Sequence, residues 1–340
     1  MPNAAVAVTM GEPAGIAGEI TLKAWLALRT SGPAFFAIAD PRALEASARA
    51  LGLDVPVVPI AAPAQASAHF TEALPVLPER LSAPVTLGQP DSRNALHVVA
   101  AIDRAVECTR LGQASSVVTN PIHKGVLYET GFRHPGHTEY LAHLAGGGMH
   151  PVMMLACREL RVVPVTVHLS LAEAVRALDS HAIVRATEIT AKALVSDFGI
   201  GEPTLAVAGL NPHAGESGHL GREEIDIIAP AVAALRAKGL RIKGPAPADT
   251  LFHPRARAAV DAVICMYHDQ ALIPLKTIDF EGGINVTLGL PFVRTSPDHG
   301  TAFDIAGQGI ASAVSLVESI RLAAAMAERR RTVATSSTAA

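Results

Sequence analysis

The chain has 340 residues, of which 49 % are hydrophobic, 17 % charged and 4 % aromatic, enough for two domains or one large α/β unit with a buried core. Its net charge of −3, without a basic stripe ahead of Arg329, excludes the electrostatic footprint of a nucleic-acid-binding protein, and its uncharged stretches are too polar for a membrane span. The cysteines, Cys108, Cys157 and Cys265, lie far apart without a CxxC pair, which indicates reduced thiols in a cytoplasmic protein.

Short apolar runs rich in Val and Ile alternate with helical patterns. Strands are predicted at residues 4–10, 34–39, 55–60, 116–119, 152–156, 162–168, 204–210, 262–268 and 284–288. Helices are predicted at residues 19–28, 97–110, 223–238 and 311–330, with one or two more within 171–198. This alternation predicts an α/β protein with a largely parallel sheet. The Pro-rich segments 55–66 and 75–84 are typical of loops or edges, and residues 331–340 predict a disordered tail.

A glycine-rich turn, "GEPAGIAGE" at residues 11–19, follows the first predicted strand and opens a helix. Its spacing differs from the G-x-G-x-x-G dinucleotide fingerprint. Backbone N–H groups at a helix start favour an anion, so the turn is a candidate ligand site. An ordinary tight turn between strand and helix is the alternative.

Three histidines follow predicted strands. His168 ends "RVVPVTVHLS", His213 lies in the loop of "TLAVAGLNPHAG", and His268 ends "DAVICMYHDQ". Ligands of parallel α/β sheets bind at the carboxyl ends of the strands, and three imidazoles gathered there suit Zn, Co or a similar divalent ion with positions left open for substrate. Alternatively, each histidine makes a local hydrogen bond in its own loop.

Two further turns carry candidate side chains. In "HPGHTE", Thr138 can cap the following helix, or His137 and Thr138 can bind an anion. In "PADTLF", Asp249 can cap the next segment or act as a catalytic carboxylate.

The last third of the chain adds three polar candidates. Lys276 follows an apolar connection, "ALIPL", where such surroundings can lower the pKa of a lysine and fit it for proton transfer; a surface lysine is the alternative. Asn285 and Arg294 flank another apolar run, and arginine pairs with phosphate or carboxylate through two parallel hydrogen bonds.

Six blocks in order, "GEPAGI", "TNPIHKG", "PGHTEY", "GLNPHAGE", "MYHDQALIPLK" and "NVTLGLPFVRTSPDHGTAFDIAG", make the chain similar to the 4-hydroxythreonine-4-phosphate dehydrogenase family of pyridoxal phosphate biosynthesis. The resemblance covers almost the whole chain. It departs from the family at Ala17-Gly18, where Gly-Pro is usual, and at Asn120, where "TGPIHK" is common.

The resemblance implies an isocitrate/isopropylmalate dehydrogenase-like fold with two α/β/α domains and an active-site cleft between them. We expect a first domain at residues 1–135 and 285–330 and a second at 136–284, which carries the metal ligands and the interface of a homodimer. The substrate would be a small phosphorylated amino acid, and neither nucleic acid nor a membrane would be a partner.

The resemblance also assigns roles to residues. The metal ligands would be His168, His213 and His268, shared between subunits. The resemblance assigns no role to Asp269 and Gln270, and we expect them to orient His268. Substrate would bind His137, Thr138, Lys276, Asn285 and Arg294, and catalysis would use Lys276, Asp249 and His137. The cofactor-binding residues would be Gly11, Glu12, Gly15, Asn120 and Asn211.

The implied reaction is oxidation of 4-phosphohydroxy-L-threonine at C3 by NAD or NADP, aided by a divalent metal (Zn, Mg or Co), followed by loss of CO2 from the β-keto acid. A dehydrogenase of the same fold acting on 4-phospho-threonate or 4-phospho-erythronate is the closest alternative. A three-histidine metal hydrolase and a non-catalytic sugar-phosphate-binding protein are alternatives of other classes.

Overall fold

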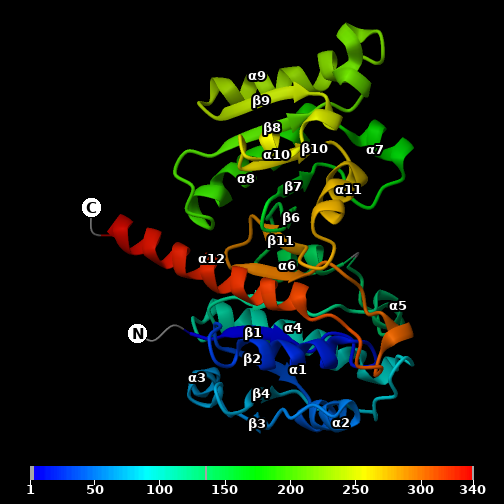
Figure 1. Cartoon of the computed structure of the whole chain (residues 1–340), viewed down its shortest axis with the longest axis vertical. Helices are drawn as coiled ribbons and strands as arrows, with labels where there is room; N and C mark the ends of the chain where they lie inside the picture. The colour runs from blue at the N-terminus through cyan, green and yellow to red at the C-terminus, as the bar shows by residue number, and fades with distance from the viewer. Residues whose placement is uncertain (1–3, 135, 339–340) are drawn as a thin grey trace. The chain divides into compact units, whose positions relative to one another are not determined.

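The chain forms two compact units, and the computed structural model describes residues 4–134 and 136–338 (Figure 1). The first unit comprises the described residues up to 151 together with 290–328, and the second comprises 152–289 with the described residues from 329 onward. These boundaries correct the expected ones in two places. Residues 136–151 belong to the first unit and residues 285–289 to the second.

Local contacts explain both shifts. Helix α6 (His137–Leu144) packs on α4 (Ala95–Arg110), where the Tyr140 hydroxyl donates to Asp103 and Arg110 Nη1 donates to Leu144 O at 3.0 Å. Strand β11 (Ile284–Leu288) pairs antiparallel with β6 (Val152–Ala156) over its whole length, which fixes it in the second unit.

The sheet of the first unit is parallel, in the order β3-β4-β2-β1-β5-β12. Its strands are β1 (Val6–Thr9), β2 (Phe35–Ala39), β3 (Val57–Pro59), β4 (Leu74–Pro78), β5 (Val117–Val118) and β12 (Arg294–Pro297). Every residue of β1, β2, β5 and β12 is buried, as expected for parallel strands covered on both faces. Strands β4 and β12 were not among the predicted strands.

Helices connect these strands. They are α1 (Ala17–Leu28), α2 (Pro41–Leu51), α3 (Ala66–His69), α4, α5 (Lys124–Glu129), α6 and α12 (Val314–Thr338), with short turns η1 (Pro63–Gln65), η2 (Ser92–Asn94) and η6 (Phe303–Ile305). Helix α2 shows why the sequence folds this way: the Asp40 carboxylate caps the N–H of Arg42, Pro41 opens the helix, and Gly52 ends it at φ 62°.

The sheet of the second unit has the order β11-β6-β7-β10-β8-β9. Besides β6 and β11 it contains β7 (Arg161–Pro164), β8 (Thr204–Ala208), β9 (Arg241–Ala246) and β10 (Ala262–Cys265). Strands β7, β10, β8 and β9 run parallel, while β6 runs antiparallel to both of its neighbours. The carboxyl ends of β7, β10 and β8 therefore meet at one edge of the sheet.

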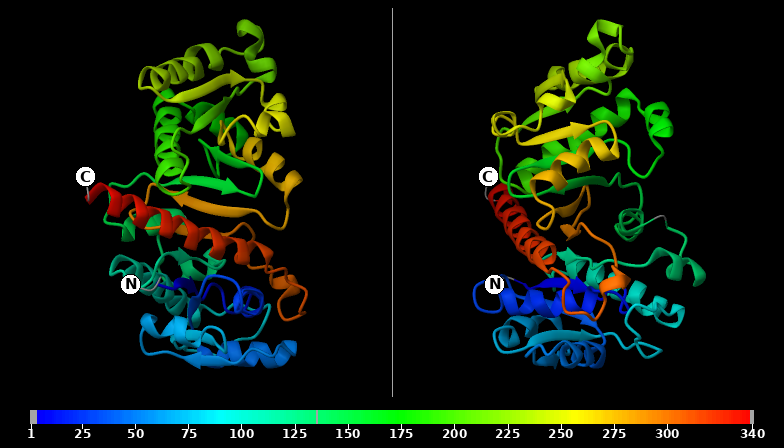
Figure 2. Two further views of the ribbon diagram at one scale, coloured as in Figure 1. Left: turned by 60° about the vertical axis from the view of Figure 1, so that its left-hand side comes forward. Right: turned by 45° about the vertical axis from the view of Figure 1, so that its right-hand side comes forward.

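The remaining helices belong to the second unit: α7 (Leu171–Ala177), α8 (Ser180–Ser196), α9 (Ala229–Ala237), α10 (Pro254–Arg257) and α11 (His268–Ile278), with turns η3 (Pro212–Gly218), η4 (Glu224–Ile228) and η5 (Ala248–Thr250). Helices α8 and α11 lie on opposite sides of the sheet (Figure 2). Over residues 4–134 and 136–338, no helix is both long and apolar enough to cross a bilayer.

The apolar "ALIPL" connection is helical and forms part of α11, a helix that was not predicted. Its Ala271 and Leu275 enter a buried cluster with strand residues such as Val162 and Val263. Pro274 lies inside the helix and has no N–H for the carbonyl of Gln270, and the Cys265 thiol donates to that carbonyl instead, at 3.8 Å. The buried thiol thus compensates for the proline. All three cysteines are free and buried, in keeping with the expected reduced thiols.

The expected disordered tail is also corrected in part. Helix α12 continues to Thr338, because residues 331–338 contain neither glycine nor proline to end it. Arg330 on this helix forms a double hydrogen bond with the buried Asp197 at 2.7 Å, which anchors the end of α12 within the second unit. Residues 339–340 lie outside the described residues.

Candidate active site

The carboxyl edge of the second sheet brings two of the predicted metal ligands together. The rings of His168 and His268 follow the adjacent parallel strands β7 and β10, and their centroids lie 6.0 Å apart. Both line a cavity of about 210 Å³ whose other residues include Thr166, Tyr267 and Asp269. Two imidazoles facing one cavity suit a divalent metal ion.

Asp269 orients His268 as predicted. Its Oδ1 lies 2.7 Å from His268 Nδ1, and a carboxylate only accepts hydrogen bonds, so Nδ1 carries the proton and Nε2 keeps its lone pair for a ligand. The contact is between sequence neighbours and is partly exposed, so it directs the ring rather than stabilising the fold.

Gln270 has a different position from the one expected. It is buried and does not orient His268; its Oε1 accepts from Met266 N at 2.7 Å, and its Nε2 donates to Gly209 O at 2.8 Å. Thr166 makes the matching bond on the other side, to Met266 O at 2.8 Å. Buried side chains therefore connect the ends of β7, β10 and β8, the three strands that carry the histidine loops.

Substituting Gln270 with alanine will lower affinity for Zn or Co by about ten- to a hundredfold, because the strand ends lose their connection while every ligand remains. Calorimetric titration of the metal measures this effect. Thr277→Ala, an exposed position on the same helix, is the control. Unchanged metal affinity in Gln270→Ala would remove Gln270 from the site.

His213 lies in an unusual loop. Residues 213–217 all have positive φ, from 43° to 80°, and His168 also has φ 53°. A left-handed conformation costs a non-glycine residue about 1 kcal/mol or more, so several residues hold strained backbone next to proposed ligands. Strain of this kind persists only where the surroundings impose it, and it concentrates at functional sites.

Glu224 imposes this conformation. Its buried carboxylate accepts from the N–H groups of Leu210 and Asn211, both at 2.7 Å, and from Asn211 Nδ2 at 2.9 Å. A Cβ on Gly215 would lie 2.6 Å from Glu224 Oε2, so the loop closes on this carboxylate only with glycine there. Asn211 therefore has a clear task in holding the loop, and its role in cofactor binding stays a prediction.

Within the described ranges of one chain, no group of three His, Cys, Asp or Glu side chains is close enough to hold a metal ion. His168 and His268 are neighbours at this edge, whereas His213 is exposed and does not group with them among the described residues. A three-histidine site therefore requires a ligand from outside this arrangement of the single chain.

The other predicted residues of the second unit lie on separate elements. Lys276 is half-buried on the last turn of α11, with its ammonium 5.1 Å from the centre of the Phe280 ring. Asn285 lies in β11, and its buried Oδ1 has no hydrogen-bond partner among the described residues. Asp249 is exposed in the turn η5, whose cap position is Pro247, so Asp249 is not a helix cap.

The first unit carries a cationic cluster at the carboxyl edge of β5. Arg294 is 3 % exposed and donates to Thr119 Oγ1 from Nε at 3.2 Å and from Nη2 at 2.6 Å; burial lowers its pKa to about 10. Burial, and then the charges of Arg294 and Lys124, hold the pKa of His137 well below its ordinary value. These residues form a site suited to an anion.

His137 begins α6, and its buried Nε2 has no partner among the residues that the structure describes. The helix is capped by Gly136, so Thr138 lies in its first turn and is not the cap. A Cβ on Gly136 would lie 3.5 Å from Lys124 Nζ, which shows how closely the lysine approaches this helix start. Lys124 and Thr119 were missed as site residues, although Thr119 ends the predicted strand at residues 116–119 and Lys124 lies in the segment that follows it.

Anion binding at this cluster will be coupled to proton uptake by His137. An anion offsets the neighbouring positive charges and raises the pKa of His137, so affinity for sulfate will increase as pH falls towards the ordinary histidine range. Sulfate itself does not titrate there, and calorimetry in buffers of different ionisation enthalpy measures the protons taken up. His137→Asn is the control, and equal uptake in that variant would contradict the assignment.

The glycine-rich turn of residues 11–19 is held by its own hydrogen bonds. Its N–H groups donate within the first unit: Glu12 N to Pro121 O, Ala14 N to Glu12 Oε1, Gly15 N to Glu12 O and Ile16 N to Thr301 O. A Cβ on Gly11 or Gly15 would lie 2.6 Å from Asn120 Cβ or Thr301 O, respectively. The glycines thus serve close packing, and these donors do not fit a pyrophosphate cradle.

Glu12 and Asn120 are likewise part of this packing. Glu12 is buried, and burial raises the pKa of its carboxyl. Asn120 Nδ2 donates to Thr9 O and Thr21 Oγ1, while its Oδ1 is buried and without a partner among the described residues. Cofactor binding by Gly11, Glu12, Gly15 and Asn120 therefore stays a prediction.

An anion site at one strand edge and paired histidines at another define an α/β enzyme of the class that acts on small anionic substrates. A family profile described as "Pyridoxal phosphate biosynthetic protein PdxA" matches residues 32–323. The chain belongs to this family, and its fold is the isocitrate/isopropylmalate dehydrogenase-like α/β fold that was expected.

Individual relatives agree. The chain is 55 % identical to a 4-hydroxythreonine-4-phosphate dehydrogenase of Caulobacter vibrioides over 97 % of this chain and 99 % of that one. A crystal structure of the enzyme of that name from Klebsiella pneumoniae is 38 % identical, with a TM-score of 0.85 over 96 % of this chain and 100 % of its own. A terephthalate 1,2-cis-dihydrodiol dehydrogenase structure from Burkholderia xenovorans is 27 % identical, with a TM-score of 0.64 over 95 % and 98 % of the two chains.

Proposed function

We propose that this protein oxidises 4-phosphohydroxy-L-threonine at C3, with NAD or NADP as acceptor, to 2-amino-3-oxo-4-phosphobutanoate. This product then loses CO2 to give 3-amino-2-oxopropyl phosphate, in pyridoxal 5'-phosphate biosynthesis. The carrying observation is the buried Arg294 with His137 and the exposed Lys124 close by, in a chain that is 55 % identical to a relative with this name. Such a cluster suits a substrate with a phosphate and a carboxylate.

Each residue of the first unit has a specific task in this proposal. The fork of Arg294 binds an anionic end of the substrate through two parallel hydrogen bonds, and Thr119 holds the guanidinium in place. His137 takes up a proton as the anion arrives and then donates from its Nε2. Thr138, in the same helix turn, adds a hydroxyl donor. Asn285 is a further substrate-binding residue in this proposal, because its buried amide oxygen has no partner among the described residues.

His168 and His268 of one chain would hold the metal, and His213 of a second copy in a homodimer would complete the ligand set. This arrangement supplies the third ligand that is missing from the described residues of the single chain. A divalent ion such as Zn, Mg or Co lowers the pKa of a bound alcohol and stabilises negative charge on its oxygen.

Lys276 moves the proton of the C3 alcohol in this proposal, and Asp249 is a second catalytic residue that the family resemblance assigns. Its position on the last turn of α11, with Leu275 buried beside it, gives the ammonium a rigid base. Lys276→Ala will keep its metal affinity and lose turnover by orders of magnitude. Turnover at the wild-type rate in that variant would end this role for Lys276.

A coupled NADH assay tests the function. Purified protein is supplied with 4-phosphohydroxy-L-threonine, 4-phospho-threonate or 4-phospho-erythronate, with NAD or NADP, and with or without chelator. We expect kcat/KM for formation of NADH or NADPH to be highest with 4-phosphohydroxy-L-threonine. This activity should be lost with chelator and restored by Zn, Co or Mg. Preference for a phosphosugar acid would replace the substrate, and phosphate release without NADH would indicate a hydrolase.

The buried free thiols are consistent with a reducing compartment, and we propose a cytoplasmic location for the enzyme. Fractionation of cells with an antibody against the protein tests this location. Recovery outside the cytoplasmic fraction would contradict it.

A further inference from the structure

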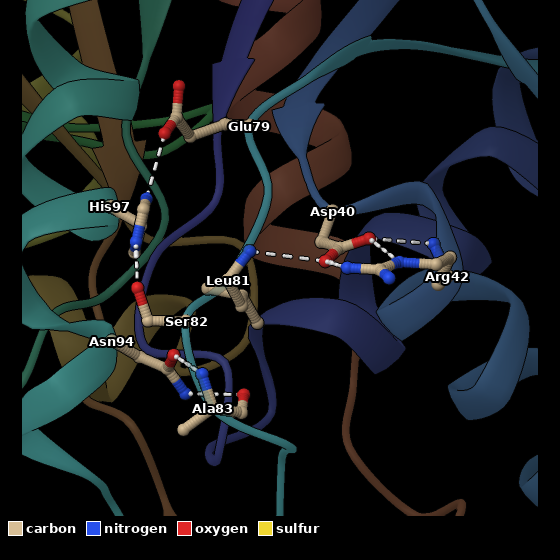
Figure 3. Close-up of polar contacts among 8 residues, drawn as sticks. All are labelled: Asp40, Arg42, Glu79, Leu81, Ser82, Ala83, Asn94 and His97. Atoms are coloured by element: carbon tan, nitrogen blue, oxygen red, sulfur yellow. Dashed lines mark hydrogen bonds and ion pairs between the residues drawn. The ribbon is translucent and has the colours of Figure 1, made fainter.

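A separate polar cluster in the first unit joins a serine, a histidine and a glutamate in one chain of hydrogen bonds (Figure 3). Ser82 Oγ lies 2.6 Å from His97 Nε2, and His97 Nδ1 lies 2.9 Å from Glu79 Oε1. Glu79 and Ser82 follow strand β4, and His97 lies in the first turn of α4. None of these residues belongs to the cationic cluster or to the histidine pair.

The bonding pattern fixes the direction of each hydrogen bond. The Glu79 carboxylate only accepts, so His97 Nδ1 carries the proton and donates to it. In the neutral ring Nε2 is then the acceptor, and the Ser82 hydroxyl donates to it. Nucleophile, base and orienting carboxylate therefore stand in the order that activates a serine.

Two buried side chains fix the backbone on both sides of Ser82. The Asp40 carboxylate accepts from Leu81 N at 3.1 Å. The Asn94 amide binds both backbone groups of Ala83, with Oδ1 accepting from its N–H at 2.9 Å and Nδ2 donating to its C=O at 3.1 Å. Asp40 and Asn94 are 4 % and 3 % exposed, so the serine projects from a loop with little freedom (Figure 3).

Ser82 also faces a space for a ligand. It lines a groove of about 620 Å³ with mostly small apolar neighbours on α2 and the loop after β4: Ala43, Ala46, Ala50, Ala83, Pro84, Val85 and Leu87. Arg42 lines the same groove with a side chain that is 70 % exposed. Ser82 itself is exposed, and its own N–H makes no hydrogen bond among the described residues, which leaves a donor for an oxyanion.

The Glu79 carboxylate is held in place by an arginine. Its Oε2 accepts from Arg104 Nη1 at 3.1 Å, and the same nitrogen donates to Pro78 O at 2.6 Å. The carboxylate is 16 % exposed and the His97 side chain 25 %. The histidine is thus anchored on one side and open to solvent on the other, where water is needed to complete a hydrolysis.

We propose that Ser82, His97 and Glu79 form a second active site, which hydrolyses carboxylic esters or thioesters with short acyl chains. The Ser82 oxygen bonds to the acyl carbon while His97 Nε2 takes its proton. The bond from that carbon to the leaving oxygen or sulfur breaks, and His97 gives the proton to the leaving group. Water then attacks the acyl-serine with its proton passing through His97, which releases the acid and restores Ser82.

The groove indicates the acyl group. Its alanine-rich walls accept a short apolar chain. Arg42 at this groove is paired with the Asp40 carboxylate, so it adds no unpaired charge for a substrate anion. We therefore expect butyryl esters to react faster than esters with long chains.

Two probes test the proposal on the full-length protein: a fluorophosphonate that labels activated serines, located by peptide mass spectrometry, and p-nitrophenyl butyrate. We expect label on Ser82 and hydrolysis that falls about a hundredfold or more in Ser82→Ala and His97→Asn. Ser47 lines the same groove but lies outside the triad, so the Ser47→Ala protein should keep both the fluorophosphonate label and the hydrolysis of p-nitrophenyl butyrate. Dehydrogenase activity is the folding control and should be unchanged in Ser82→Ala.

Three results would overturn the second site: wild-type protein that takes no label, label on another residue, or hydrolysis that persists in Ser82→Ala. If the His97→Asn protein loses dehydrogenase activity as well, it has lost its fold. The labelling and hydrolysis results for Ser82→Ala then decide whether the second site exists. The dehydrogenase and esterase assays are separate. A negative esterase result therefore does not contradict the proposed oxidation, and a negative dehydrogenase result with the folded protein does not contradict the second site.

Discussion

A protein in which His213 is replaced by alanine will lose metal-dependent turnover. Mixing it with His168→Ala protein will restore about a quarter of wild-type activity, because random exchange of chains between two-fold dimers makes one site in four complete. On the proposed ligand set, a mixed dimer has one complete site out of two, formed by the chain with intact His168 and His268 together with His213 of its partner. The described residues of a single chain provide the His168 and His268 pair without a third ligand.

The control is a mixture of His168→Ala with His268→Ala. Both changes remove ligands from the same pair, so no mixed dimer has a complete site and activity should stay at the background. Recovery in this control, or no recovery in the first mixture, would show that the ligands are divided between chains in another way. Sedimentation of the unmixed proteins checks that each variant still forms dimers.

Replacing Arg294 by alanine will lower kcat/KM by about a hundredfold or more, equivalent to roughly 3 kcal/mol, because a buried guanidinium that pairs with an anion is removed. Arg294→Lys keeps the charge without the fork and should fall between alanine and wild type. Arg321→Ala, on the exposed side of α12, is the control.

Arg294 is buried, so its removal can also weaken the fold. Thermal unfolding of each variant separates the two effects, and guanidinium added to Arg294→Ala should restore part of the activity by occupying the vacated space. A variant that stays folded with wild-type kcat/KM would show that the cluster does not bind substrate.

Most strands were predictable because their residues are continuous, apolar and buried on both faces, as in β1 and β10. Strand β4 was missed because Pro75 and Pro78 suggested a loop. It forms all the same, with Pro75 paired to Val58 in the three-residue strand β3, where little of the ladder is lost. Strand β12 was missed because its residues, Arg294–Pro297, are mostly polar and yet buried.

Helix α11 was missed for a tertiary reason. Pro274 normally ends a helix, and no local pattern reveals that the Cys265 thiol bonds the carbonyl left open at Gln270. The boundary at residue 136 was placed too early because the packing of Tyr140 against Asp103 joins positions that are far apart in sequence.

The candidate site was predictable in its residue types and strand-end positions. The order of the strands, β7-β10-β8, was not, and this order decides that His168 and His268 are neighbours. The left-handed backbone at His213 was equally hidden, because it depends on the carboxylate of Glu224 eleven positions later. Lys124 carried no periodic signal, and its place beside the start of α6 emerged only from the structure.

The division of the chain into units also has a consequence for synthesis on the ribosome. The first unit is begun first, but its strand β12 is made only after residue 293, so β5 waits with an open edge while residues 152–289 emerge. Those residues contain every strand of the second unit. The later half of the nascent chain can therefore complete its sheet before the earlier half, and the unpaired edge of β5 is the surface that a chaperone would have to shield in the meantime.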